Sequence, residues 1–191
     1  MRPGNHIPLC TIAGSDPMGG AGLQGDLKTF AAHGADGTAV VTAITVQDPT
    51  GVHRVEGVAA DLVGEQLDVV LAVVRPVALK IGMLWDGAVA EAIGLRLEAA
   101  KGLPVVLDPV LGATSGGRLA RPHLLEALCA HLLPRATVLT PNLAEAAWML
   151  GRSSVPPDGM EAAARDLLAL GPGAVLLKGG HARGPDAVDV L

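Results

Sequence analysis

The amino-acid sequence predicts an α/β fold in which helices cover both faces of a doubly wound, mostly parallel sheet. Short β-branched runs alternate with stretches of helical periodicity along the whole chain, and this alternation implies parallel strands joined by right-handed crossovers. Half of the 191 residues are hydrophobic and only 17% are charged, as expected of strands that are covered on both faces. No stretch has the composition of an interdomain linker, so we expect one domain over residues 1–191.

Strands are expected where β-branched residues cluster, and helices where apolar residues recur at intervals of three and four. The strand-like runs are residues 7–13, 38–46, 77–81, 105–107, 137–139 and 174–177. The helical stretches are residues 23–31, 62–74, 88–100, 122–132, 143–150 and 160–170, and Gly34, Gly102 and Gly171 stand where helices should end. Ligands bind such sheets at the carboxyl ends of the strands. Residues that directly follow a strand are therefore the candidates for a functional site.

Charge and cysteine usage exclude several kinds of partner. The net charge of −5 argues against a nucleic-acid surface, which needs clustered Lys and Arg. No apolar run approaches the roughly 18 residues of a membrane span. Cys10 and Cys129 have no metal-ligand spacing and are typical of buried thiols in a reducing compartment. We expect a soluble, cytoplasmic protein that binds neither nucleic acid nor a membrane.

A glycine-rich segment follows the first expected strand. It reads TIAGSDPMGGAGLQGDLKTF and holds five glycines in residues 11–30. Gly20 to Gly25 formally satisfies G-x-G-x-x-G, which keeps a nicotinamide-dependent oxidoreductase as one alternative. However, further residues separate this pattern from the strand, and Asp48, the acidic residue at a suitable distance, is followed by a Pro-Thr turn. A tight strand-to-helix connection would explain some of the glycines, but not the whole run with Ser15 and Asp16 inside it.

Five blocks in order along the chain resemble one kinase family. They are residues 13–48 (from AGSDPMGG to TVQD), KIGML at 80–84, LDPV at 107–110 with TSG at 114–116, TPNLAEA at 140–146, and LKGGH at 177–181. Together they resemble the hydroxymethylpyrimidine and phosphomethylpyrimidine kinases of thiamine biosynthesis, which belong to the ribokinase-like superfamily. The resemblance implies ATP- and Mg²⁺-dependent phosphorylation of 4-amino-5-hydroxymethyl-2-methylpyrimidine or its monophosphate, and a homodimer. A pyridoxine-type kinase and a catalytically inactive pyrimidine-binding module remain alternatives.

The resemblance implies that the glycine segment wraps the small substrate. Gly14 and Gly22 have no side chain, so the backbone can approach a ring closely, and the N–H groups that open the next helix could accept negative charge. Gln47 follows Thr45 at a strand end, and its amide offers the donor and the acceptor that suit an aminopyrimidine edge. Asp26 corresponds to a family aspartate that faces the substrate; a carboxylate favoured by the helix dipole is the alternative.

Two apolar residues complete the expected substrate site. Met83 follows a strand end, where a thioether is an adaptable surface against a flat ring, and Val110 after Asp108-Pro109 is similar. Ordinary core packing is the alternative for both.

The nucleotide side is expected after the later strands. The resemblance places Asp108 near the metal and the phosphates, and Lys178 where it would neutralise phosphate charge. Asn142 and Glu145 form the family's N-x-x-E motif, which organises Mg²⁺ and phosphate, with Glu145 as the metal residue acting at least partly through water. The same two residues also form a capping-box pattern, and both roles can hold at a helix N-terminus.

The chain departs from the family in two places. The resemblance implies a Gly-Thr-Gly-Cys-type loop whose N–H groups form an anion hole, but no such pattern follows Gly151. We therefore assign no catalytic residue, and expect that the C-terminal part of the domain is missing after Leu191, that turnover is slight or absent, and that apolar surface is exposed. Thr114 stands where the family commonly carries lysine.

Overall fold

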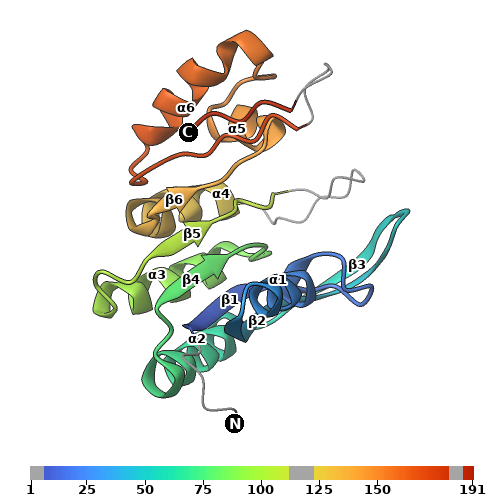
Figure 1. Cartoon of the computed structure of the whole chain (residues 1–191), viewed down its shortest axis with the longest axis vertical. Coiled ribbons are helices and arrows are strands. Elements are labelled where there is room, and N and C mark those ends of the chain that lie inside the picture. The colour runs from blue at the N-terminus through green and yellow to red at the C-terminus, as the bar shows by residue number, and fades with distance from the viewer. Residues whose placement is uncertain (1–6, 112–122, 181–186) are drawn as a thin grey trace.

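A six-stranded sheet with the order β3-β2-β1-β4-β5-β6 organises the molecule (Figure 1). This computed structural model describes residues 7–111, 123–180 and 187–191. The strands are β1 (Ile7–Ser15), β2 (Ala35–Asp48), β3 (Gly51–Gly57), β4 (Ala78–Ile81), β5 (Val105–Leu107) and β6 (Val138–Leu139). Neighbouring strands are parallel except for the antiparallel pair β2 and β3. The prediction of a mostly parallel, doubly wound sheet is confirmed.

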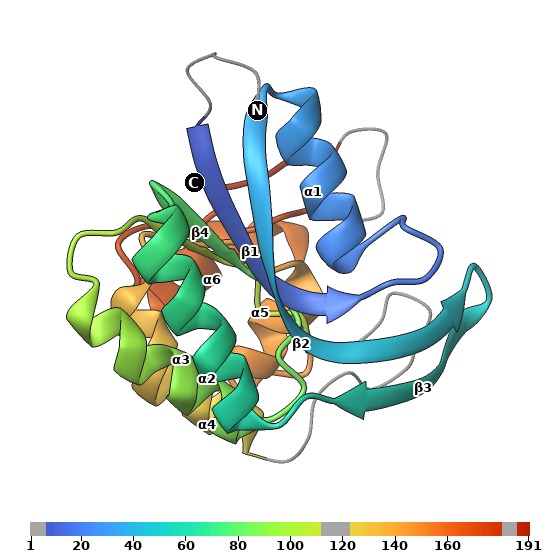
Figure 2. The ribbon, with the colours of Figure 1, turned by 90° about the horizontal axis from the view of Figure 1, so that it is seen from below.

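Helices cover both faces of this sheet. They are α1 (Gly22–Ala32), α2 (Ala60–Val69), α3 (Gly87–Ala99), α4 (Leu124–Ala127), α5 (Leu143–Met149) and α6 (Met160–Leu168). Figure 2 shows α1 on one side of β1 and β2, with α2, α3 and α4 packed beside one another on the other side. The largest fully buried side chains are all Leu or Ile, among them Ile12, Leu107 and Leu139. An aliphatic core suits a chain in which only 2% of the residues are aromatic.

Two expectations differ from the structure. Residues 51–57 form β3, which the sequence analysis did not identify, because His53, Arg54 and Glu56 give this edge strand an exposed, polar character. The strand expected at residues 174–177 forms isolated bridges instead, with Leu139 paired to Val175. The helix expected at 62–74 is present, and the one expected at 122–132 is present from Leu124 onward; each ends in a π-helical turn, at Val70–Val74 and Leu128–Leu132.

Two strands change register just before predicted site residues. β1 shifts against β2 between Ala13 and Gly14, and β2 shifts against β3 between Val46 and Gln47. Bulges of this kind re-aim side chains and are frequent beside active sites. The local geometry of Gly14 and Gln47 is therefore set by irregularities in the sheet, which strand periodicity alone would not predict.

The sequence predicts neither a membrane-spanning helix nor a disulfide. In the part of the chain that the structure describes, no helix is both long and apolar enough to cross a membrane. Cys10 is buried and Cys129 is half-buried, and both are free thiols. Burial raises the pKa of Cys10 to about 11, although a hydrogen bond with Thr38 opposes this shift. A thiol held protonated in this way behaves as a small hydrophobic side chain.

Candidate active site

The glycine segment is organised by the Asp16 carboxylate. One of its oxygens accepts a hydrogen bond from the Met18 N–H at 2.9 Å, and the other accepts from the N–H groups of Gly20 and Ala21 at 2.9 and 2.8 Å. Asp16 is only 4% exposed. The N–H groups before α1 were expected to be available to an anionic ligand, but those of Gly20 and Ala21 are already used by Asp16.

Gln47 belongs to the same network. Burial acts to raise the pKa of Asp16, but the hydrogen bond from the Gln47 amide and those from the backbone N–H groups outweigh it, so the pKa lies below its ordinary value. Because an ionised carboxylate can only accept, Gln47 donates through its NH₂ group. Gln47, the next-to-last residue of β2, is thereby connected to the loop that follows β1.

The glycines permit a close approach between α1 and β1. Gly22 has a φ of +53°, and a Cβ there would lie 2.3 Å from the Gly14 carbonyl oxygen. A Cβ at Gly14 would lie 3.1 Å from the Met83 sulfur. Thr45 is buried, and its hydroxyl donates to the Ser15 carbonyl oxygen at 2.9 Å. The structure therefore brings together four of the residues predicted to bind the substrate.

An apolar wall stands beside these residues. It consists of buried Ala43 and Met83 with Val52, Val55, Trp85 and Val110 packed against them. The sequence analysis proposed Met83 and Val110, and the structure places both in this one cluster, separate from the main core. Val52, Val55 and Trp85 were missed, the two valines because the strand β3 was itself missed.

Asp26 lies in an ion pair. Its Oδ2 accepts from the Thr11 hydroxyl at 2.6 Å and from Lys80 Nζ at 2.8 Å. Both side chains of the pair are about one-fifth exposed, at 20% for Asp26 and 23% for Lys80. The pair ties α1 to β1 and β4, and direct contact between Asp26 and a substrate stays a prediction.

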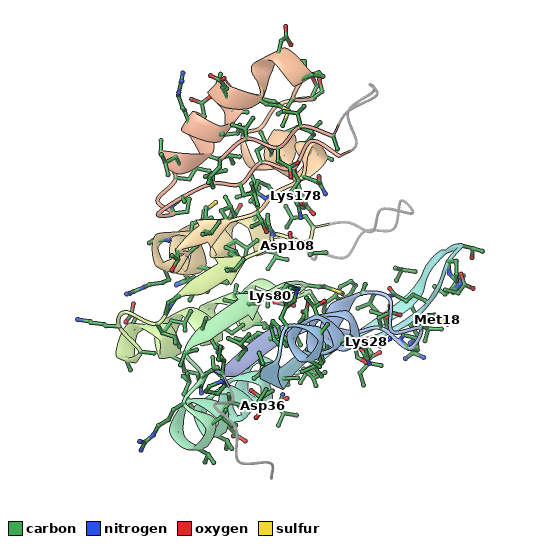
Figure 3. All side chains as sticks on the ribbon, viewed as in Figure 1. Met18, Lys28, Asp36, Lys80, Asp108 and Lys178 are labelled. Carbon is green, nitrogen blue, oxygen red and sulfur yellow. The ribbon has the colours of Figure 1, made fainter. Side chains whose placement is uncertain are left out.

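A second polar group lies after β5 and β6. Lys178 Nζ and Asp108 Oδ1 are 2.8 Å apart (Figure 3), and the Thr140 hydroxyl lies 3.3 Å from the same oxygen. Asn142 and Lys178 face one another in an isolated parallel bridge. Three residues that the sequence analysis assigned to the nucleotide side thus adjoin one another, although 70 positions separate Asp108 from Lys178.

Glu145 completes this group. It forms a capping box with Asn142, in which the Glu145 N–H donates to Asn142 Oδ1 at 2.9 Å and the Asn142 N–H donates to Glu145 Oε2 at 2.8 Å. Burial raises the pKa of Glu145 to about 6; the Asn142 N–H lowers it, the charge of Asp108 raises it and that of Lys178 lowers it. The predicted capping geometry is confirmed, and Glu145 is also a buried carboxylate close to a second one.

The two groups share one edge of the sheet. Ser15, Met83, Asp108 and Thr140 each end or follow one of the parallel strands β1, β4, β5 and β6, so they lie along its carboxyl edge, as the sequence analysis predicted. Thr114 and His181 fall outside the described residues. Asp16 was noticed in the sequence but given no role; the signal was an Asp-Pro at the start of a turn, where Asx side chains bind backbone N–H groups.

Comparison with known proteins identifies the family to which this fold and site belong. The sequence model of the phosphomethylpyrimidine kinase family matches residues 16–191. A hydroxymethylpyrimidine/phosphomethylpyrimidine kinase of Rhizobium meliloti is 48% identical over 184 residues, which are 95% of this chain and 68% of that protein. The chain spans about two thirds of the length of this protein and of two further curated relatives with the same name, from Salmonella typhimurium and Escherichia coli.

Solved structures agree with the sequence relatives. A phosphomethylpyrimidine kinase from Clostridium difficile matches with a TM-score of 0.86 and 42% identity, over 96% of this chain and 79% of that one. A pyridoxal kinase from Staphylococcus aureus in complex with AMP-PCP and pyridoxal matches with a TM-score of 0.86 and 35% identity, over 97% and 67%.

The fold and the site define an α/β small-molecule kinase of the ribokinase-like type. Within this class, the chain belongs to the phosphomethylpyrimidine kinase family. The expected family, fold and kinase type are confirmed, and the use of ATP follows from membership of the family.

Proposed function

We propose that this chain binds 4-amino-5-hydroxymethyl-2-methylpyrimidine or its monophosphate as the acceptor of a phosphoryl group from ATP. The observation that carries the proposal is the pairing of the apolar wall with Gln47 at the end of β2. A flat aminopyrimidine has apolar faces and a polar edge, so it needs both kinds of surface. The name of the Rhizobium meliloti relative described above points to the same acceptor.

The hydrogen bond with Asp16 would orient the Gln47 amide toward the ring. Asp16 takes one N–H of the Gln47 amide, which leaves the amide oxygen and the second N–H for the ligand. The oxygen would accept from the exocyclic amino group, and the N–H would donate to the neighbouring ring nitrogen. Gly14, Gly22 and Thr45 would close the backbone around the ring, and the apolar wall would contact its face.

The nucleotide side would handle phosphate charge. Phosphoryl transfer depends mainly on alignment and on neutralising charge. Lys178 is suited to phosphate oxygens because its side chain is partly exposed beside Asp108, at 39%. Asn142, the N-cap residue of α5, would lie beside these phosphates.

The donor set also fits Mg²⁺. Among the described residues no group of three or more His, Cys, Asp or Glu could hold a metal ion, but Mg²⁺ typically takes only one or two carboxylates, with water and phosphate oxygens completing its shell. Asp108 and Glu145 would supply these carboxylates, and their mutual repulsion, which helps to raise the pKa of Glu145, is what a cation offsets. When bound, Mg²⁺ supplies positive charge against the phosphates.

Calorimetric titration with 4-amino-5-hydroxymethyl-2-methylpyrimidine tests the proposal. We expect saturable binding that Gln47→Ala weakens by about tenfold or more, since it removes two hydrogen bonds and leaves Asp16 short of one. Glu56→Ala is the matched control, because Glu56 lies on the same hairpin with its side chain 69% exposed. A folded chain that does not bind the pyrimidine would contradict the proposal.

Pyridoxal is the second candidate acceptor, because a structural relative at a TM-score of 0.86 is a pyridoxal kinase in complex with pyridoxal. The same titration with pyridoxal decides between the two rings. A phosphoryl-transfer assay with ATP then separates a kinase from a chain that only binds.

We further propose a cytoplasmic homodimer. The two free cysteines suit a reducing compartment. Ile44 and Val46 on β2 are 57% and 53% exposed, and adjacent apolar side chains on one strand are a surface that a second subunit would cover. Light scattering gives the molar mass, and a monomer at all concentrations would contradict the dimer.

A further inference from the structure

Trp85 has a strained backbone in the connection between β4 and α3. Its φ is +71°, and it is one of three non-glycine residues with positive φ in the described part of the chain. A bulky residue in this region is uncommon and costs free energy, and such strain gathers at ligand-binding sites. The next residue, Asp86, caps α3 in an ordinary way, with its side chain accepting from the Ala88 N–H. The strain is therefore confined to Trp85.

This backbone conformation places the indole against the β2–β3 hairpin. A Cβ at Gly57 would lie 2.4 Å from Cδ1 of Trp85 and 2.9 Å from Nε1. Gly57 pairs with Ala43 across the hairpin, and Val55 pairs with Thr45. Trp85 therefore covers the side of the hairpin on which Ala43 and Thr45 lie, while Ile44, which alternates with them, is exposed.

The indole thus belongs to the apolar wall. It packs against the cluster of Ala43 and Met83, as Val110 does. The chain has two tryptophans, one phenylalanine and no tyrosine, and the other two aromatic residues lie on α1 and α5. A scarce aromatic side chain, held by a strained backbone, is thus the one aromatic member of the wall.

We propose that Trp85 determines ring specificity in this site, with its indole in contact with the aromatic ring of the acceptor. The inference rests on the proposed function and deepens it. An indole offers a flat, polarisable face to a heteroaromatic ring, and such contacts between an aromatic side chain and a base add measurably to affinity. An aliphatic side chain of similar reach fills the same space without this interaction.

The rival explanation is that Trp85 only fills space between the hairpin and α3. Trp85→Phe and Trp85→Leu separate the two explanations, because both keep a bulky residue at positive φ and only one keeps an aromatic ring. Both variants are made in a Trp148→Phe background. Trp148 lies on α5, outside the apolar wall, so this background leaves Trp85 as the single indole of the parent protein.

Each protein is titrated with 4-amino-5-hydroxymethyl-2-methylpyrimidine by calorimetry, and the Trp85 fluorescence of the parent is followed in parallel. We expect the pyrimidine to change this fluorescence with the dissociation constant that calorimetry gives. Trp85→Leu should bind about tenfold more weakly or worse, and Trp85→Phe should bind close to the parent. The midpoints of thermal unfolding of the two variants should be similar.

Two results would overturn the inference and are distinguishable from failure of the proposed function. If calorimetry shows binding by the parent but the Leu and Phe variants bind equally well, or the Trp85 fluorescence does not change at saturation, Trp85 only fills space and the proposed function stands. If the folded parent shows no pyrimidine binding by calorimetry, both proposals fail.

Discussion

Asp16 and Glu145 are two buried carboxylates at the same edge of the sheet, and their pKa values are shifted in opposite directions. Asp16, on the substrate side, is 4% exposed, and hydrogen bonds from Gln47 and three backbone N–H groups lower its pKa. Glu145, on the nucleotide side, is 7% exposed, and burial together with Asp108 raises its pKa to about 6. Both side chains are little exposed, but the Glu145 carboxyl group is surrounded by more protein, receives fewer hydrogen bonds and lies near the charge of Asp108, so the two pKa values shift in opposite directions.

The opposite pKa shifts of Asp16 and Glu145 distinguish two kinds of site. On the substrate side every oxygen of Asp16 is already engaged, so the carboxylate holds the loop in one shape. On the nucleotide side the charge of Glu145 is only partly compensated, so it is suited to a cation or to a change of protonation. The following experiments test this distinction.

Asp16→Ala should have the largest effect. It removes the acceptor of three backbone N–H groups and of Gln47. A hydrogen bond to a charged group contributes about 1.5–3 kcal/mol to stability, and water would replace part of this contribution in the variant. We expect a loss of roughly 3 kcal/mol in the free energy of unfolding by urea, and no measurable pyrimidine binding by calorimetry. Asp16→Asn keeps an acceptor oxygen, so its losses of stability and of pyrimidine affinity should be smaller than those of Asp16→Ala. Unaltered affinity in Asp16→Ala would show that the loop does not depend on this carboxylate.

Gly22→Ala should have the second-largest effect. The new Cβ would lie 2.3 Å from the Gly14 carbonyl oxygen, at a φ of +53°, so backbone must move. Gly102→Ala is the matched control, because its φ is +83° but no atom lies within 4 Å of the added Cβ. We expect about 1 kcal/mol of destabilisation for the control and clearly more for Gly22→Ala, with loss of pyrimidine affinity in that variant alone. Equal losses in the two variants would mean that close approach at Gly22 is unimportant.

The pKa of Glu145 predicts a pH dependence of stability. Its pKa is raised from an ordinary value of 4.5 to about 6 in the folded state, so the folded protein takes up a proton before the unfolded chain does as the pH falls. The free energy of unfolding should therefore rise between pH 7 and pH 4.5, relative to that of Glu145→Gln, by about 2 kcal/mol. Urea unfolding of both proteins across this range measures it. A difference independent of pH would show that Glu145 is compensated as fully as Asp16.

The ion pair between Asp26 and Lys80 should give the smallest effect. A double-mutant cycle with Asp26→Asn and Lys80→Met should yield a coupling of about 1 kcal/mol in unfolding, because the pair is only partly buried. Pyrimidine affinity, measured for the same four proteins, tests the predicted substrate contact. If Asp26→Asn lowers affinity equally with and without Lys80, Asp26 contacts the ligand by itself; if the loss disappears with Lys80 absent, Asp26 acts through the ion pair.

The sequence allowed the sheet and the edge that carries the site to be predicted, because hydrophobic periodicity determines both. It also allowed Gly14, Met83 and Val110 to be assigned to one site, through the resemblance to a family. The strand β3 was not predicted, because its exposed polar side chains do not follow the pattern of a buried strand. Because β3 was not predicted, Val52 and Val55 were not assigned to the site either.

Other features depend on information that no local pattern carries. Asp26 and Lys80 are 54 positions apart, and their ion pair depends on the register of β1 against β4. The positive φ of Trp85 is imposed by the packing around it, since the residue type disfavours that conformation. Such features follow from tertiary structure, so they become visible only when the strands are placed side by side.

The arrangement of the two polar groups along the chain sets the order in which they can form during synthesis. Every residue assigned to the substrate side, from Gly14 to Val110, precedes every residue of the nucleotide side except Asp108. The bond between Asp108 and Lys178 closes a segment of 70 residues, and closing a long segment is entropically costly and slow. Since domains emerge from the ribosome N-terminus first, the residues proposed to bind the pyrimidine can come together on the nascent chain before Lys178 has been translated.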